Sequence, residues 1–266
     1  MDSFLEFQGK RVGYTIEGAG NAIVLLHGFI ESRTIWNNFA LRLAKEFTVL
    51  TIDLPGHGES EVVSEIHSMT LMAEVVKTVM VESGISSALV VGHSMGGYVA
   101  LEFAHLFPES MTGLVLFHSQ AAPDSDETKE NRRRTIDIVR KNRGGFIRQF
   151  IPDLFDQRFV GSYSEAIGKL VDEAGKMSQE GIIAALSGMR DRIGGLEFLM
   201  TTQLPVLFII GKHDSRIPYN QVLAQAVIPS HSEVLLLDKV GHMGYIEAPD
   251  ITLQAIRHFS MRCFES

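Results

Sequence analysis

The chain of 266 residues is 45% hydrophobic, which indicates a substantial core and excludes an intrinsically disordered protein. Its formal net charge of −8 offers no basic surface, so we expect no nucleic-acid partner. The single cysteine, Cys263, excludes an internal disulfide framework.

The sequence carries no signal for secretion or for membrane insertion. Its first residues, MDSFLEFQGK, lack a basic segment followed by a long apolar one. No apolar run approaches the length of about 18 residues that a membrane span needs. We therefore expect a cytoplasmic location and no membrane partner, while the sequence does not decide the oligomeric state.

Short apolar segments alternate with helical patterns along most of the chain. Continuous apolar strands separated by helices are typical of a parallel sheet buried on both faces. We therefore predict an α/β fold with a mainly parallel, doubly wound sheet, and an antiparallel hairpin around Gly9 at its edge. The expected strands are Arg11–Ile16, Ala22–Leu26, Phe47–Leu54, Ala88–Val91, Gly113–Phe117, Val206–Ile210 and Glu233–Leu237, and the expected helices are Ile35–Glu46, Leu71–Glu82, Gly96–Leu106, Tyr219–Val227 and one beginning at Pro249.

Residues 119–202 interrupt this alternation. They contain no comparable Val/Ile strand but show helical patterns at Glu127–Arg140 and Tyr163–Lys176. Ser162 and Glu165 stand at the spacing of a capping box for the second helix. Because the segment is too long for a loop, we predict a helical insertion over the sheet.

The predicted organisation is therefore a core of residues 1–118 and 203–266 with residues 119–202 inserted as a helical cap. The insertion contains the basic run Arg132-Arg133-Arg134 among several acidic residues. We interpret this run as a charged, solvated helix face rather than as an anion site.

The motif GHSMGG places a serine between a buried strand and a helix. Ser94 is therefore expected on the sharp turn of a nucleophile elbow, with Gly92 and Gly96 small because the turn brings neighbouring segments close together. The turn presents the hydroxyl at the C-terminal edge of the sheet, where α/β proteins bind ligands. We predict that Ser94 is a nucleophile and that the Met95 N–H, at the helix N-terminus, stabilises an oxyanion.

A serine nucleophile needs a base, and the chain order nucleophile, acid, histidine selects among ten histidines. His242 follows the last predicted strand and fits the base. Asp214, in GKHDSRIP, follows the preceding strand and is predicted to fix the imidazole tautomer. The strand ending at Phe117 is followed by no carboxylate before Asp124, so Asp214 is preferred.

The loop LLHGFIES is expected to supply the second oxyanion donor. Gly28 allows a tight turn that directs the Phe29 N–H toward the same point as the Met95 N–H, although an ordinary glycine turn is the alternative. His93 is expected to pack inward. Three other histidines near this edge are expected to line the site without acting as the base, namely His27, His57 and His118.

Together these motifs resemble the α/β-hydrolase fold superfamily, through its HGF, DLPGHGES, GHSMGG, G-x-x-D and G-H elements. The resemblance covers residues 4–118 and 203–262, and the insertion stands where the family carries its cap. It implies that the DLPGHG segment is structural. Family members with this pattern include carboxylesterases, enol-lactone hydrolases, carbon–carbon bond hydrolases, proline iminopeptidases and cofactor-free haloperoxidases.

The resemblance implies a serine hydrolase that cleaves a small carboxylic ester or lactone through an acyl-enzyme on Ser94. The family's dehalogenases and epoxide hydrolases carry Asp at that position, and Phe29 replaces the glycine-rich run of many lipases. We expect no cofactor and no metal, because the chain has neither a cysteine cluster nor an H-E-x-x-H motif. The alternatives are a carbon–carbon bond hydrolase or lyase, a haloperoxidase or perhydrolase with the same triad, and a small-molecule receptor on the same fold.

Large side chains near the same edge are candidates for the substrate pocket. If several of them line the site, the substrate has an apolar acyl or ring portion. The insertion would then govern the choice of substrate rather than the chemistry. The candidates are Trp36, His118, Phe150, Leu154, Phe155 and Met243, beside Phe29 and Met95.

Overall fold

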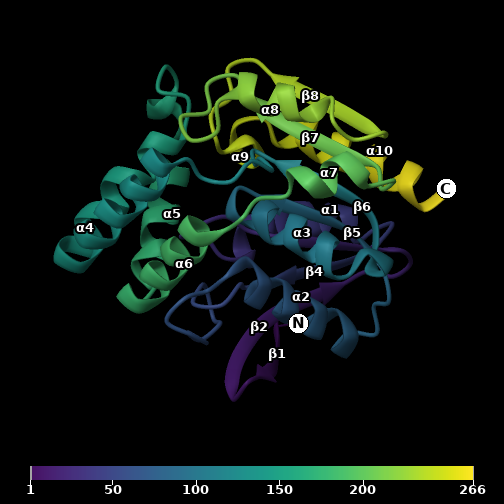
Figure 1. The fold of residues 1–266 in the computed structure, drawn as a ribbon, viewed down its shortest axis with the longest axis horizontal. Coiled ribbons are helices and arrows are strands. Elements are labelled where there is room, and N and C mark those ends of the chain that lie inside the picture. The colour runs from purple at the N-terminus through teal and green to yellow at the C-terminus, as the bar shows by residue number, and fades with distance from the viewer. Residues whose placement is uncertain (1, 266) are drawn as a thin grey trace.

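The computed structural model describes residues 2–265, which form an eight-stranded sheet with helices on both faces (Figure 1). The strands are β1 (Asp2–Phe7), β2 (Lys10–Glu17), β3 (Ala22–Leu26), β4 (Thr48–Ile52), β5 (Ala88–His93), β6 (Met111–Phe117), β7 (Val206–Gly211) and β8 (Ser232–Leu237). Their order in the sheet is β1-β2-β4-β3-β5-β6-β7-β8. Neighbouring strands of the run β4-β3-β5-β6-β7-β8 are all parallel, whereas the pairs β1–β2 and β2–β4 are antiparallel. The predicted fold class and edge hairpin are therefore confirmed.

The core helices cover the two faces of the sheet. Helices α1 and α10 lie near each other, joined by an ion pair of 2.6 Å between Arg42 and Asp250. Helix α3 packs against β5 and β6, and α2 packs against α3. No helix within residues 2–265 has both the length and the apolar content to span a bilayer. The core helices are α1 (Asn37–Leu43), α2 (Met69–Glu82), α3 (Met95–Leu106), α8 (Tyr219–Ala226), α9 (Gly244–Glu247) and α10 (Pro249–Glu265).

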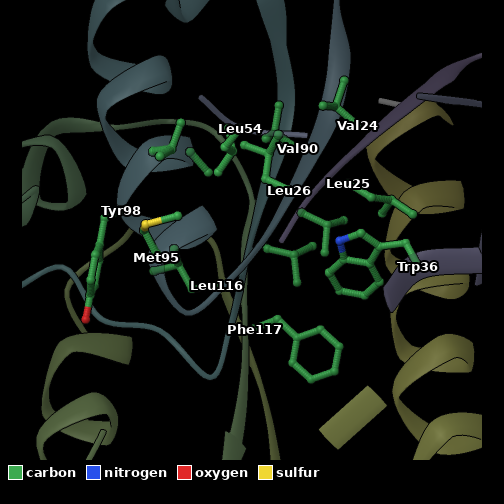
Figure 2. Close-up of a cluster of buried hydrophobic side chains, with 14 of the residues drawn as sticks. Val24, Leu25, Leu26, Trp36, Leu54, Val90, Met95, Tyr98, Leu116 and Phe117 are labelled. Atoms are coloured by element: carbon green, nitrogen blue, oxygen red, sulfur yellow. The ribbon is translucent and has the colours of Figure 1, made fainter. Parts of the chain in front are cut away.

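The central strands are apolar at nearly every position because both of their faces are covered. Every residue of β3 and of β5 is buried. Phe117 of β6 packs with Trp36 on one side of the sheet, while Met95 and Tyr98 of α3 lie on the other side (Figure 2). Burial of each such large apolar side chain stabilises the fold by roughly 1.5–3 kcal/mol.

The structure describes every residue between β6 and β7, and these residues form helices and turns but no strand. Helices α4, α5 and α6 gather at one end of the molecule, beyond the sheet (Figure 1). The helices of this segment are α4 (Asp126–Phe150, kinked at Asn142), α5 (Ser164–Gly175), α6 (Gln179–Asp191) and α7 (Leu196–Thr201).

The two helical patterns of this segment are confirmed as α4 and α5, but the predicted capping box is wrong. Tyr163 is the N-cap residue of α5 and makes no side-chain cap, because Ser162 lies in a preceding 3-10 turn. Serine caps begin the neighbouring helices instead: Ser125 accepts from the Thr128 N–H at α4, and Ser178 accepts from the Gly181 N–H at α6.

Candidate active site

Ser94 lies on the turn between β5 and α3 with strained backbone angles of φ 50° and ψ −113°. Such angles in a non-glycine residue cost about 1–3 kcal/mol and persist only where the surroundings enforce them. The turn requires glycine on both sides: a Cβ added at Gly92 would lie 2.3 Å from the Gly96 carbonyl oxygen, and one at Gly96 would lie 2.5 Å from the Leu26 carbonyl oxygen. The Ser94 N–H donates to the Phe117 carbonyl at 2.9 Å, which fixes the turn against β6.

The structure brings Asp214 and His242 together at the same edge of the sheet. His242 Nδ1 lies 2.8 Å from Asp214 Oδ2, and both side chains are almost fully buried. The other carboxylate oxygen accepts the N–H groups of Arg216 and Ile217 at 2.8 and 2.9 Å. A carboxylate on Nδ1 orients the opposite ring nitrogen for proton transfer. Ser94 and His242 line one cavity.

The charge of Asp214 is stabilised by two histidines. Burial raises the pKa of Asp214, but the attraction of His242 and the hydrogen bonds of His118 and His242 outweigh it, so the pKa lies well below its usual range. His118 Nδ1 lies 3.5 Å from Asp214 Oδ2. Burial lowers the pKa of His118 to about 4, so its ring is neutral at neutral pH. Asp214 is therefore ionised, which its predicted role as the orienting acid requires.

The two expected oxyanion donors lie in the loop after β3 and at the start of α3. Among residues 2–265, neither the Phe29 N–H nor the Met95 N–H has a hydrogen-bond acceptor. The loop is anchored on both sides of Gly28, because the Gly28 N–H donates to Glu31 Oε2 at 2.6 Å and the Leu54 N–H donates to His27 Nε2 at 3.0 Å. Two free N–H groups in fixed loops suit an oxyanion.

A buried ion pair connects the loop after β3 to the nucleophile turn. Glu31 Oε2 lies 2.9 Å from His93 Nδ1, and Glu31 Oε1 accepts the Tyr245 hydroxyl at 2.9 Å. His93 Nε2 donates to the His242 carbonyl oxygen at 2.9 Å. Since both ring nitrogens face acceptors, His93 must carry two protons. Burial lowers the pKa of His93, but Glu31 outweighs it and raises the pKa overall.

The pair of Glu31 and His93 therefore links the loop after β3, the nucleophile turn and the loop of His242. The predicted inward packing of His93 is confirmed by an exposure of 1%. Glu31 was missed by the sequence analysis. The available signal was an acidic residue inside the apolar stretch GFIES, where burial demands a partner.

The insertion also contacts the backbone of the loops that carry Asp214 and His242. The His242 N–H donates to the Leu154 carbonyl at 2.7 Å, and Ser215 Oγ donates to the Asp153 carbonyl at 2.6 Å. Glu247 accepts the N–H groups of Gly241 and Met243, on either side of His242, at 3.0 Å each. It also accepts the Asp156 N–H at 2.8 Å. The segment between β6 and β7 thus supports the position of His242 as well as the walls of the cavity.

The cavity beside Ser94 has a volume of about 350 Å³. Three of the expected pocket residues, Phe29, Phe150 and Leu154, line it, and Phe150 packs edge-on against Phe29 with ring centroids 5.8 Å apart. The sequence analysis missed much of the remaining wall, which α4, α6 and the loop after Asp214 supply. These missed residues include Gln120, Arg132, Leu186, Met189, Arg216 and Gln221.

The structure places the other pocket candidates in the core, which corrects those expectations. Trp36 is fully buried against Phe117 and Tyr245, and Phe155 is fully buried and stacked on Tyr163 with centroids 5.3 Å apart. The remaining candidates are also buried within the core and do not line the cavity: His118, Met243 and the side chain of Met95, together with His27 and His57.

The basic run of α4 is only partly a solvated helix face. Arg133 and Arg134 are 57% and 70% exposed and pair with Glu130. Arg132 is 18% exposed, lines the cavity and pairs with Asp124. Asp124 also binds Arg192, so the alternative acid is occupied by two guanidinium groups.

The buried carboxylate of the DLPGHG segment has structural partners. Asp53 accepts the Arg33 N–H at 2.7 Å and the Glu59 N–H at 2.9 Å. These contacts fix the loop after β4, and none of residues 53–60 lines the cavity beside Ser94. No group of three or more His, Cys, Asp or Glu side chains within residues 2–265 is arranged to hold a metal ion.

Comparison with known proteins agrees with the observed fold. A family model described as alpha/beta hydrolase fold matches residues 21–249. A thermophilic esterase from Thermogutta terrifontis is 31% identical with a TM-score of 0.93, covering 99% of each chain. A pimeloyl-[acyl-carrier protein] methyl ester esterase from Aeromonas hydrophila is 26% identical over 91% of this chain and 96% of its own length. A putative non-heme haloperoxidase from Mycobacterium phage D29 is 29% identical over 84% of this chain and 82% of its own length. The chain belongs to the α/β-hydrolase fold family.

Proposed function

We propose that this protein is a serine hydrolase that cleaves a small carboxylic ester or lactone through an acyl-enzyme on Ser94. The observation that carries the proposal is the contact of 2.8 Å between Asp214 and His242 at the cavity that Ser94 lines. The relatives named as esterases support this activity.

In the proposed mechanism, Ser94 Oγ attacks the substrate carbonyl while His242 Nε2 accepts its proton. Asp214 holds the imidazole tautomer and stabilises the imidazolium. The N–H groups of Phe29 and Met95 bind the oxyanion, a contribution worth about 2.7–4 kcal/mol per donor in known cases. His242 then protonates the leaving group and activates a water molecule that hydrolyses the acyl-enzyme.

The cavity supports a small substrate. Its volume of about 350 Å³ lies near the lower end of ligand pockets, which run from about 300 to 1,000 Å³. We propose that residues 119–202 act as a cap on a core of residues 1–118 and 203–266, because α4 and α6 supply much of the cavity wall. Phe29, Phe150 and Leu154 favour an apolar group close to the reacting carbonyl.

A second candidate function is the halide or peracid chemistry of a cofactor-free haloperoxidase. The relative from Mycobacterium phage D29 carries that name. Both functions would use Ser94 and His242, so they differ in the nucleophile that attacks the acyl-enzyme: water in one case and hydrogen peroxide in the other.

The test is a steady-state assay with short 4-nitrophenyl esters, lactones and vinylogous diketones. We expect Ser94-dependent turnover of an ester or lactone, and loss of that turnover in Ser94→Ala. Acyl transfer to hydrogen peroxide faster than to water would favour the second candidate. Turnover of the diketones alone would contradict ester hydrolysis.

A further inference from the structure

Two guanidinium groups, those of Arg132 and Arg216, line the cavity beside Ser94 in a chain whose net charge is −8. Asp124 lines this cavity and is bound by Arg132 and by Arg192, so that cluster has one surplus positive charge. Glu31 is balanced by His93. Arg216 adds a second guanidinium to the wall, where it feels the carboxylates of Asp153 and Asp214, and Asp214 is shared with His242.

Arg216 lines the cavity, its side chain is 35% exposed, and its charge is only weakly neutralised by its neighbours. Its guanidinium has one ion-pair contact among residues 2–265, to Asp153 at 3.8 Å, which is too long for a hydrogen bond. The Asp153 side chain is itself 55% exposed, so water screens that contact. Burial lowers the pKa of Arg216, which reflects the desolvation of its charge.

The position of Arg216 is fixed relative to the reacting groups. Its backbone N–H donates to Asp214 Oδ1 at 2.8 Å, which ties the residue to the loop of the orienting acid. Its guanidinium carbon lies 4.4 Å from the centroid of the Phe150 ring, and that ring lines the same cavity. A guanidinium stacked on a ring presents its N–H groups in the plane parallel to it.

Neutral polar groups accompany this charge. Gln120 Oε1 is buried and has no hydrogen-bond partner among the described residues, although Gln120 lines the cavity. Gln221 lies on the same wall as Arg216. A buried polar atom without a partner is costly, so this wall is suited to a ligand with polar groups rather than to a purely apolar one.

We propose that Arg216 binds a free carboxylate of the substrate, so that the preferred substrate is an ester or lactone carrying a second, ionised carboxyl group. The planar fork of the guanidinium matches a carboxylate in two parallel hydrogen bonds. Phe29 and Phe150 would contact the apolar carbon chain between the two groups. This inference rests on the proposed ester hydrolysis and specifies its substrate class.

Two matched pairs of substrates test the inference, with the carboxylate on either side of the scissile bond. On the acyl side, mono-4-nitrophenyl adipate is compared with 4-nitrophenyl hexanoate, in which a methyl group replaces the carboxylate. On the alcohol side, 4-acetoxybenzoate is compared with its methyl ester. The rates are corrected for enzyme-free hydrolysis, and kcat and KM are measured separately.

We expect the protein to prefer the charged member of at least one pair. In Arg216→Gln, kcat/KM for that member should fall about tenfold or more, chiefly through KM, while its neutral counterpart changes less than about twofold. Arg216→Lys should retain part of the preference, and added salt should weaken it. Arg148→Gln is the matched control, because it removes the same charge from an exposed position of α4.

Equal losses for both members of each pair in Arg216→Gln, or no loss for either, would overturn the inference while ester hydrolysis stands. A protein that turns over neither these esters nor any of the esters and lactones of the activity assay would instead contradict the proposed function. Binding decides the inference in that case: monomethyl adipate and 4-acetoxybenzoate are titrated into Ser94→Ala with and without Arg216→Gln. An approximately tenfold weaker Kd for one of them supports the carboxylate site, and unchanged Kd values for both overturn it.

Discussion

Replacement of Glu31 by Gln tests whether the buried ion pair behind the nucleophile maintains the site. The substitution keeps the size of the side chain but removes its charge. Glu31 Oε2 receives two donors, the Gly28 N–H at 2.6 Å and His93 at 2.9 Å. The amide oxygen must therefore occupy that position, leaving the amide NH2 toward the Tyr245 hydroxyl.

The energetic cost follows from the surroundings of His93. In the Glu31→Gln variant, a charged imidazole has no counter-charge, whereas a neutral imidazole directs a lone pair at an acceptor, either the amide oxygen or the His242 carbonyl. Breaking a buried ion pair costs about 3–5 kcal/mol, and an unsatisfied buried polar group costs about 1–3 kcal/mol. Because His93 can become neutral, which is the less costly of the two states, we expect a loss of about 3 kcal/mol in the free energy of unfolding.

The loss should depend on pH with a definite sign. The pKa of His93 is raised from 6.5, so its stabilising contribution is fully present below about pH 6.5 and decreases as pH rises through the folded-state value. The pKa of Glu31 is lowered, so its contribution is present above about pH 4.5 and is lost as pH falls through the folded-state value. The difference between wild type and Glu31→Gln should therefore be largest between about pH 4.5 and 6.5.

The measurement is urea unfolding across this pH range, together with kcat on a short ester. We expect kcat to fall on the order of 10- to 100-fold, because His93 supports the loop of His242. Glu165→Gln is the control, since it breaks an exposed pair with Lys169 and should leave the free energy of unfolding nearly unchanged. Equal stability of Glu31→Gln and wild type at pH 6, or a loss that grows toward alkaline pH, would refute the reasoning.

Two further predictions concern the acid and the cavity wall. Asp214→Asn should fold and lower kcat on the order of 10⁴-fold, because the amide favours the wrong imidazole tautomer; near wild-type activity in steady-state assays would contradict its role. Phe150→Ala should weaken selection for bulky acyl groups by about 1–3 kcal/mol in kcat/KM relative to acetate esters. Phe155→Ala, its fully buried counterpart, should lower the unfolding free energy by about 3–5 kcal/mol without shifting that selection, and the reverse pattern would refute the assignment of the two rings.

The sheet could be predicted in detail because its signal is local. Residues of β3 and β5 are buried on both faces, so each strand appears as a continuous apolar run. The elbow was equally visible because its motif is local in the sequence, although the contacts that require its glycines are local only for Gly92, which approaches Gly96, and not for Gly96, which approaches the Leu26 carbonyl. The pairing of Asp214 with His242 could be inferred because both follow the ends of neighbouring parallel strands.

The insertion was less predictable because its helices are shaped by contacts with the core. Helix α6 contains Gly181 and Gly188, which weaken its helical signal. A Cβ at Gly188 would lie 1.7 Å from the His67 carbonyl, and one at Gly181 would lie 2.6 Å from the Gly56 carbonyl. These glycines are required by close packing that no local pattern reveals.

The cavity wall shows the same limit. Phe150 and Phe155 are the same residue type and lie close together in the sequence. The end of α4 nevertheless directs Phe150 to the cavity, whereas a turn buries Phe155. Arg132 differs from Arg133 and Arg134 only in the direction that its helix position imposes. Glu31 and Arg216 acquire their surroundings from segments distant in the sequence, so their environment could be seen only in the folded chain.

The central claim is that Ser94 is the activated nucleophile, and covalent labelling with a fluorophosphonate tests it most directly. Intact-mass and peptide-mass measurements should show one adduct per chain, located on Ser94. Labelling should be absent from a folded Ser94→Ala variant and much slower in a His242→Ala variant. A folded wild-type protein that takes up no probe, or takes it up on another residue, would contradict the account.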